Sequence, residues 1–202
     1  QVELALPNGE IRLGNIVTLS EDFTVIQVYE GTNGMSCKGV KTEFTGSPLK
    51  LKLSKDMLGR IFDGTGRPID GLGQINVQTE REIGGEPINP VAREYPKNFI
   101  ETGISAIDGL MTLIRGQKLP IFSGSGINHN KLTEKIIRQA NIKDESGFAI
   151  VFGLIGAEYE TAEFFRKSFE ENGILDKVVT FQNLSNDPSI ERILTPKVAL
   201  TC

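Results

Sequence analysis

The sequence predicts two parts, a small antiparallel β-sheet or barrel followed by an α/β domain built on a parallel sheet. Three observations support this prediction. Short apolar runs separated by turn residues fill the chain up to about Leu53, apolar strands alternate with amphipathic helices after Ile104, and a Ser/Gly-rich turn lies between a strand and a helix at 123–130. A chain of 202 residues has room for one ordinary domain, or for a small module and part of a larger one.

The N-terminal part, residues 1–53, is typical of a meander of short strands. Turn residues at 31–34 follow two apolar runs, 11–19 and 23–29. About four strands are expected, and a barrel of this size normally needs one or two more strands to close. We expect those strands to precede Gln1, so that the barrel in this chain is incomplete.

The second predicted domain spans 54–202 and opens with a long connecting loop at about 59–98. This loop is rich in glycine and proline, and so long a stretch without regular structure is expected only where it crosses from one module to another over a packed surface. The chain begins with glutamine rather than methionine and ends inside an expected helix. We therefore expect the parallel sheet to be truncated at the C-terminus.

Beyond the loop, strands and helices alternate, which favours a parallel sheet with right-handed crossovers. Strands are expected at 118–122, 148–152 and 178–181. Helices are expected at 130–140, at 158–171 and after Pro188. Residues at helical spacing predict their buried faces: Leu132, Ile136, Ile137 and Ala140 in the first, Ala162, Phe165 and Phe169 in the second, Ile190, Ile193 and Leu194 in the third.

Composition excludes several classes of function. With 22 Lys and Arg against 26 Asp and Glu, the net charge is −4, so the basic surface of a nucleic-acid-binding protein is not expected. No run of 18 apolar residues free of charge predicts insertion into a membrane. The two cysteines, Cys37 and Cys202, are too few for a zinc site, so no metal is expected, and they favour a reducing compartment. Four aspartates beside Gly or Pro are expected to form turns: Asp63, Asp70, Asp108 and Asp187.

The turn at 123–130 has the context of a phosphate-binding P-loop but lacks its chemistry. In the motif G-x-x-x-x-G-K-[ST], Ser123 and Asn128 stand at the two glycines, His129 at the lysine and Asn130 at the hydroxyl residue. Histidine is shorter than lysine and mostly neutral near pH 7, and an amide is a poor substitute for a hydroxyl on Mg²⁺. We expect a degenerate phosphate loop, with His129 in a capping or surface role. Its members are Ser123, Gly124, Ser125, Gly126, Asn128, His129 and Asn130.

Five segments, in this order and at this spacing, resemble the non-catalytic B subunit of the V-type and archaeal-type rotary ATPases. They are MLGRIFDGTGRPIDG (57–71), PINPVAREYP (87–96), TGISAIDGL (102–110), RGQKLPIFSGSG (115–126) and NDPSIERILTPKVALT (186–201). Where the family turn continues Leu-Pro-His-Asn after SGSG, this chain has Ile-Asn-His-Asn. The resemblance covers nearly the whole chain, and it implies that the chain is a fragment lacking the start and the C-terminal part of the subunit.

The resemblance implies a β-barrel followed by a RecA-like nucleotide-binding domain, set beside catalytic A subunits in an alternating A3B3-type ring above central stalk subunits. In the catalytic relatives a glutamate that polarises the attacking water follows the next strand. Here Ala157 stands at that general-base position, so the chain lacks both this carboxylate and the phosphate-loop lysine. No catalytic residue, no required cofactor, and weak or no ATP or ADP binding are therefore expected. Arg115 and Lys118, which flank the expected strand, are candidates for a subunit interface.

The same resemblance implies a regulatory subunit that couples ATP hydrolysis or synthesis to proton or sodium transport. It would lie in the cytoplasmic head of the ATPase, peripheral to the membrane, without nucleic-acid partners. Two alternatives stay open. A stand-alone P-loop NTPase would need the missing lysine and carboxylate. An RNA-translocating RecA-like hexamer would need a basic groove or an aromatic platform, which an isoelectric point near 5.2 does not favour.

Overall fold

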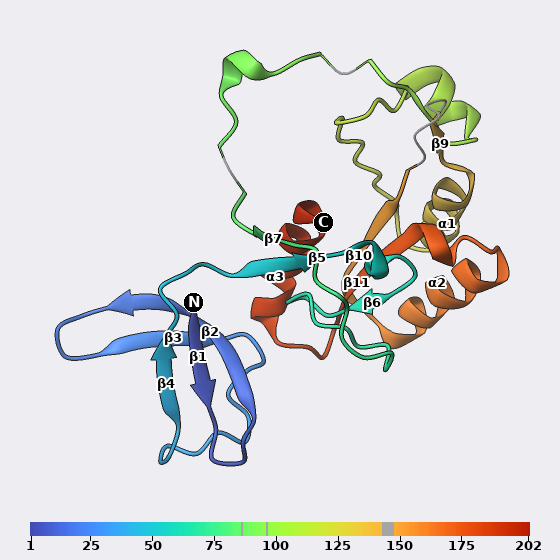
Figure 1. Ribbon diagram of the computed structural model, residues 1–202. Coiled ribbons are helices and arrows are strands. Elements are labelled where there is room, and N and C mark those ends of the chain that lie inside the picture. Colours follow the sequence, from blue (N-terminus) through green and yellow to red (C-terminus); the bar gives the residue numbers. More distant parts are fainter. Residues whose placement is uncertain (86, 96, 143–147) are drawn as a thin grey trace.

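The computed structural model describes residues 1–85, 87–95, 97–142 and 148–202. Its N-terminal part is a four-stranded antiparallel sheet in the order β3-β2-β1-β4, seen in blue in Figure 1. The strands are β1 (Val2–Ala5), β2 (Ile11–Leu19), β3 (Thr24–Val28) and β4 (Lys41–Phe44). Val2 and Leu4 alternate with outward residues and form a small core with Val28, as period-two patterning requires.

The structure shows this N-terminal sheet as open, and it does not show the expected barrel. Within the described residues, β3 and β4 are the two edges of the sheet and are not paired with each other. Four short strands do not accumulate enough twist and tilt for the first to hydrogen bond to the last.

The second sheet is parallel, as predicted, with the order β10-β11-β6. Its strands are β6 (Ile61–Phe62), β10 (Ile150–Ala157) and β11 (Val178–Leu184), and Ile150 of β10 stands opposite Val178 of β11. The expected strands at 148–152 and 178–181 thus exist. Both continue several residues further toward their C-terminal ends than the sequence predicts.

Helices cover both faces of the parallel sheet, because side chains alternate between the faces along each strand. Two helices follow the strands, α2 (Tyr159–Glu171) and α3 (Ser189–Thr201). On the α2 face, one buried cluster contains Phe152, Leu154, Ala162, Phe165, Phe169 and Val178. On the α3 face, a second contains Leu51, Met57, Phe62, Val179, Phe181 and Val198.

The predicted buried face of α2 is confirmed, and that of α3 is correct only in part. Leu194 is buried and Ile190 is partly buried against the N-terminal sheet, but Ile193 is 59% exposed. The first helix is α1 (His129–Gln139), and all four of its predicted apolar residues are partly rather than fully buried.

The expected connecting stretch 59–98 contributes regular structure. It supplies β6 to the parallel sheet, and it supplies β7 (Thr79–Glu82), which pairs antiparallel with β5 (Lys50–Leu53). Leu51 of β5 lies in the same buried cluster as Phe62 and Val198, so β5 packs on the second sheet. The remaining short elements are η1 (Lys55–Met57), η2 (Pro90–Ala92), β8 (Ile100–Glu101), the π-helical turn η3 (Ile107–Met111), β9 (Asn141–Ile142) and η4 (Leu175–Lys177).

The expected strand at 118–122 is wrong. These residues have no regular secondary structure, and Phe122 is 92% exposed. Pro120 provides no backbone N–H for a strand ladder, and an apolar run becomes a strand only where a neighbouring strand accepts it. In Figure 1 the described residues between β7 and α1 run in a wide arc away from both sheets.

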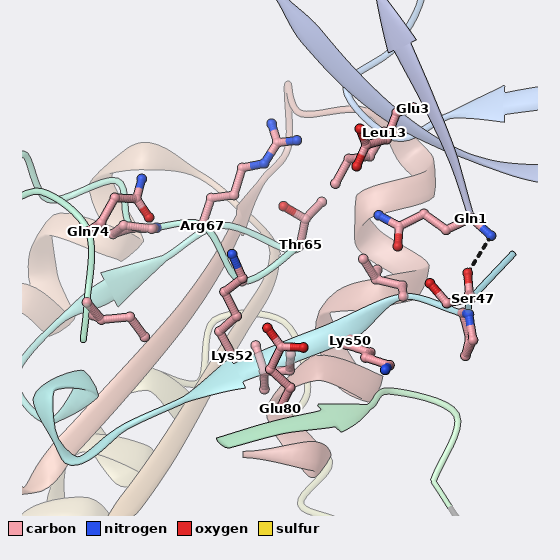
Figure 2. Close-up of a pocket in the computed structure, with 16 residues that line it drawn as sticks. Gln1, Glu3, Leu13, Ser47, Lys50, Lys52, Thr65, Arg67, Gln74 and Glu80 are labelled. Atoms are coloured by element: carbon pink, nitrogen blue, oxygen red, sulfur yellow. Dashed lines mark hydrogen bonds between the residues drawn. The ribbon is translucent and has the colours of Figure 1, made fainter. Parts of the chain in front are cut away.

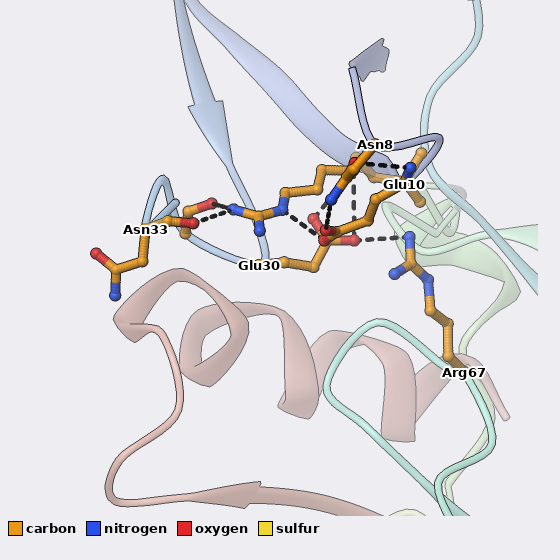
Figure 3. Close-up of polar contacts among 8 residues, drawn as sticks. Asn8, Glu10, Glu30, Asn33 and Arg67 are labelled. Atoms are coloured by element: carbon orange, nitrogen blue, oxygen red, sulfur yellow. Dashed lines mark hydrogen bonds and ion pairs between the residues drawn. The ribbon is translucent and has the colours of Figure 1, made fainter. Parts of the chain in front are cut away.

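The N-terminal sheet meets the second part of the chain at a mixed apolar and polar junction. Tyr29, Leu49 and Leu194 form a buried cluster, so the end of β3 packs against α3. Beside it, Arg67 makes a 2.6 Å ion pair with Glu30. Figure 3 shows Arg67 and Glu30 close to Glu10 and Asn33. Arg12 donates to the Glu10 carboxylate and to the carbonyls of Gly31 and Asn33.

Candidate functional site: a degenerate phosphate loop

The start of α1 is fixed by Asn128, which acts as the N-cap. Its side-chain oxygen accepts a hydrogen bond from the amide of Lys131 at 3.2 Å. The capping role expected of His129 therefore belongs to its neighbour, while His129 itself is the first helical residue and is exposed. The carbonyl of His129 accepts a bond from the hydroxyl of Thr133. The sequence predicts either a capping or a surface role for His129, and the structure places it at the surface.

The turn before α1 is open to solvent and uses part of its own backbone. The amide of Ile127 donates to the carbonyl of Gly124 at 3.3 Å, and the amide of His129 donates to the carbonyl of Ile127 at 2.9 Å. Gly126 has a left-handed backbone with φ +85°, and a Cβ on Gly124 or Gly126 would meet no atom within 4 Å. A phosphate cradle requires several amides converging on one anion. Here two of those amides already face carbonyl oxygens.

The side chains at the remaining phosphate-loop positions are also exposed. Ser123, Ser125 and the two glycines lie fully at the surface, and Asn130 is partly buried in the first turn of α1. Loop and helix are adjacent in the chain, as the sequence predicts, but the preceding strand that would place them at a sheet edge is absent. The roles of these residues stay predictions.

Ala157 is the last residue of β10, at the carboxyl end of the parallel sheet where α/β proteins bind ligands. It stands opposite Leu184, and its carbonyl accepts a bond from the amide of Ser185 at 2.8 Å. The next residue, Glu158, is exposed and makes no side-chain cap bond to α2. The residue at the predicted general-base position is therefore a partly buried methyl group.

Arg115 and Lys118, the candidates for a subunit interface, are both exposed. The backbone of Arg115 is anchored, because its amide donates to the carbonyl of Asn98 at 2.8 Å. Neither side chain forms a salt bridge within the part of the chain that the structure describes. Their role at an interface stays a prediction.

The four turn aspartates have the structural roles that the sequence predicts. Asp63 accepts bonds from the amides of Thr65 and Arg67 and from the hydroxyl of Thr65. Asp108 and Asp187 cap their own turns in the same way. Asp70 does more, because Arg60 donates to both of its carboxylate oxygens and holds the pKa of Asp70 at about 2.

The sequence analysis did not identify Glu191, a buried glutamate with a raised pKa. It lies in the first turn of α3 with 7% of its surface exposed, on the helical face that also buries Leu194, Thr195 and Val198. Burial first, then the negative charges of Asp63, Asp187 and Glu30, raise its pKa to about 7. The signal was available, because an acid three, four and seven residues before buried positions lies on the packed face of a helix.

A pocket of about 460 Å³ opens between the N-terminal sheet and the β5–β7 pair (Figure 2). Figure 2 shows Lys52 and Glu80 rising from these strands toward the loop that bears Thr65 and Arg67. Lys52 stands directly across the strand pair from Glu80, and Lys50 across from Glu82. Charges of both signs therefore alternate along this wall, whereas a phosphate site collects cations and amide donors.

Comparison with known proteins decides the family. Residues 103–202 match the ATP synthase alpha/beta family, nucleotide-binding domain. The chain is also 54% identical over 203 residues to the V-type ATP synthase beta chain 2 of Clostridium tetani (strain Massachusetts / E88). The chain belongs to the ATP synthase alpha/beta family.

This result agrees with the resemblance that the motifs indicate. The family model covers residues 103–202, and the alignment to the Clostridium protein extends over both parts of the fold. The alignment covers 99% of this chain but 44% of the Clostridium protein, so the chain spans less than half the length of that relative. Among the described residues, no helix combines the length and apolar character needed to cross a bilayer. In the same residues, no three acidic, histidine or cysteine side chains gather into a candidate metal site.

Proposed function

We propose that this chain is part of the non-catalytic, regulatory B subunit of a V-type or archaeal-type rotary ATPase. The subunit alternates with catalytic A subunits in an A3B3-type ring and contacts the central stalk. It couples ATP hydrolysis or synthesis in the A subunits to proton or sodium transport. It works in the cytoplasmic head, peripheral to the membrane, and needs neither a nucleic acid nor a cofactor of its own.

The observation that carries this proposal is the chemistry of the phosphate loop within a member of the ATP synthase alpha/beta family. His129 is an exposed imidazole at the position of the phosphate-binding lysine, and Ala157 has no carboxylate to orient water. Phosphoryl transfer depends almost entirely on positioning and charge stabilisation, and both groups that supply them are missing. A binding and regulatory role fits these residues better than hydrolysis.

The proposal predicts that the chain alone hydrolyses ATP no faster than buffer and binds Mg-ATP with a Kd weaker than about 0.1 mM. The measurements are a coupled ATPase assay and titration calorimetry. Mixing the chain with an A-type subunit that has an intact G-x-x-x-x-G-K-[ST] loop should form a complex. ATPase activity of that complex should disappear when the lysine of the A-type loop is replaced.

The matched variant is Gly124→Val, at an open position with ordinary φ. Turnover near 1 s⁻¹ by the chain alone, in the low range of phosphoryl-transfer enzymes, that vanishes in Gly124→Val would establish an independent NTPase instead. Low-micromolar binding of Mg-ATP to the chain alone would contradict the weak-binding part. Tight binding of single-stranded RNA would favour the RNA-translocating alternative.

A further inference from the structure

The chain contains three Asn-Gly pairs, at residues 8–9, 33–34 and 172–173. This dipeptide is especially open to deamidation, because glycine has no side chain to hinder the attack of its own backbone nitrogen on the preceding asparagine. All six residues are exposed, so exposure does not distinguish the three pairs. Their hydrogen bonds distinguish them.

Deamidation requires two groups to be available, the glycine amide and the asparagine side chain. The glycine nitrogen loses its proton to base and attacks Cγ of the asparagine. The new N–Cγ bond closes a succinimide ring, the Cγ–Nδ2 bond breaks, and the amide nitrogen takes up a proton and leaves as ammonia. Water then opens the ring at either carbonyl carbon and gives aspartate or isoaspartate. A hydrogen bond at either group must open before the attack.

Both groups are held at the Asn8–Gly9 pair. The Asn8 side chain accepts a bond from the Glu10 amide at 3.0 Å and donates to the Glu10 carboxylate at 3.3 Å. The Gly9 amide donates to the carbonyl of Leu6 at 3.0 Å. The nucleophile and the carbon it would attack are therefore both fixed in the turn between β1 and β2.

The Asn172–Gly173 pair is held in the same way at the C-terminal end of α2. The Asn172 side chain donates to the carbonyl of Ser168 at 2.7 Å and to its hydroxyl at 3.2 Å. The Gly173 amide donates to the carbonyl of Glu170 at 3.1 Å. Opening one hydrogen bond slows a reaction by about 2- to 13-fold, so a bond at each of the two groups slows it by at least about fivefold.

Neither group is held at the Asn33–Gly34 pair. No hydrogen bond reaches the Asn33 side chain or the Gly34 amide from any residue that the structure describes. In Figure 3 the Asn33 side chain points away from the polar contacts drawn there. The turn itself is closed by the amide of Met35, which donates to the carbonyl of Thr32 at 3.1 Å. Both reacting groups are therefore available.

Arg12 favours the reaction at this pair. Its Nη1 donates to the carbonyl oxygen of Asn33 at 3.0 Å and to that of Gly31 at 2.9 Å, while its Nε binds Glu10. The Asn33 carbonyl belongs to the same peptide unit as the Gly34 nitrogen. When that nitrogen loses its proton, negative charge develops on the oxygen through the resonance of the peptide bond. A guanidinium that donates to this oxygen stabilises the charge.

We propose that Asn33–Gly34 is a spontaneous deamidation site, selected over the other two Asn-Gly pairs by its unbonded side chain and amide and assisted by Arg12. The co-reactant is water, and the leaving group is ammonia. The product is aspartate or isoaspartate, so the turn that Arg12 holds gains a negative charge. The reaction needs no nucleotide and is independent of the function proposed above.

Peptide mapping by mass spectrometry tests the proposal, because trypsin, which cuts after lysine and arginine, releases each pair on a peptide of its own. The peptides are 1–12, 13–38 and 168–177. The chain is incubated at pH 8, folded or unfolded in guanidinium chloride, and the conversion of each peptide is followed with time. Folding should slow peptides 1–12 and 168–177 by at least about fivefold, and peptide 13–38 clearly less. At pH 6 all rates should fall, because fewer glycine amides lose their proton.

Three variants identify the groups that react and assist. Asn33→Gln should abolish the conversion of peptide 13–38, which also contains Asn15. Arg12→Met should slow conversion at Asn33 by about tenfold, the lower end for a hydrogen bond from a charged group, because the site is exposed. The matched control is Arg67→Met, since Arg67 is a neighbouring arginine that binds Glu30 instead, and it should leave the rate unchanged.

The selectivity is refuted if folding slows peptide 13–38 as much as the other two, or if the conversion persists in Asn33→Gln. Arg12 could instead only tether the turn, and its loss would then leave the rate unchanged or raise it; either result would overturn the assistance. Circular dichroism checks that the variants are folded. If Arg12→Met is unfolded, the comparison of the three peptides in the unmodified chain decides whether the site is selected.

Discussion

Replacing Asp70 by asparagine should cost about 2 kcal/mol of unfolding free energy at pH 7. Arg60 donates to both carboxylate oxygens of Asp70, and the amides of Ile61 and Leu72 donate at 3.2 and 3.1 Å. The bond from Arg60, ahead of these amides, lowers the pKa of Asp70 from 3.8 to about 2. A pKa shift costs about 1.4 kcal/mol per pH unit, so the lowered pKa of Asp70 corresponds to the expected loss of unfolding free energy. Both side chains of the pair are largely buried, so solvent screening reduces this energy little.

The pH dependence has a definite sign. Because the pKa of Asp70 is lower in the folded chain than in the unfolded chain, its contribution is complete above pH 3.8 and is lost as the pH falls toward 2. Urea denaturation followed by circular dichroism at pH 7, 5, 3 and 2 measures the gap between the two proteins. That gap should be constant from pH 7 to 5 and should shrink at pH 3 and 2.

The control for this experiment is Glu163→Gln, which removes an ion pair with Arg166 on the surface of α2. Both side chains of that pair are more than a quarter exposed, so solvent screens the pair and the loss should be clearly smaller than that of Asp70→Asn. An Asp70→Asn chain as stable as the unmodified chain at pH 7 would contradict the stabilising role of the Arg60–Asp70 pair. A stability difference between the two proteins that stays constant down to pH 2 would contradict it as well.

Five further substitutions, two of them controls, test packing, close approach and capping by the same denaturation assay. Phe181→Ala should cost about 3–5 kcal/mol because the ring is fully buried, whereas Phe122→Ala at an exposed ring should change stability by less than about 0.5 kcal/mol; equal effects would contradict the assigned burial. Gly64→Ala should destabilise by about 1–3 kcal/mol because its Cβ would stand 2.6 Å from a hydroxyl on α3, and Gly84→Ala, in open space, should be neutral or slightly stabilising. Asn128→Ala should cost about 1 kcal/mol and raise amide hydrogen exchange at the start of α1, and unchanged exchange there would exclude the cap.

Elements with strong periodicity could be predicted from the sequence. The spacing of Ala162, Phe165 and Phe169 identifies one face of a helix, and the apolar run at 178–181 identifies a strand, because in both cases local pattern and final burial agree. The strand at 118–122 could not be predicted correctly, since its apolar residues satisfy the pattern but find no neighbouring strand. The two-residue β6 was missed for the opposite reason, because pairing with β11 creates it.

In the candidate site, too, some features could be predicted from the sequence and others depend on the fold. Ala157 lies at the end of its strand, as the order of residues predicts, and the phosphate-loop residues precede a real helix. The choice of Asn128 over His129 as the cap required the backbone geometry. Glu191 was missed because its environment is assembled from Glu30, Asp63 and Asp187, which are brought together only by the fold.

The close approach at Gly64 has a mechanical consequence. With a hydrogen atom in place of a side chain, Gly64 lets the 63–67 turn approach the Glu191 carbonyl and the Thr195 hydroxyl of α3 so closely that a Cβ would not fit. Interiors packed to this density resist compression, so a rotation of α3 must displace the turn by a comparable amount. Arg67 stands at the end of that turn and holds Glu30, so the displacement reaches the N-terminal sheet without a hinge between them. The close contact at Gly64 and the Arg67–Glu30 ion pair thus couple the motion of α3 to that of the N-terminal sheet.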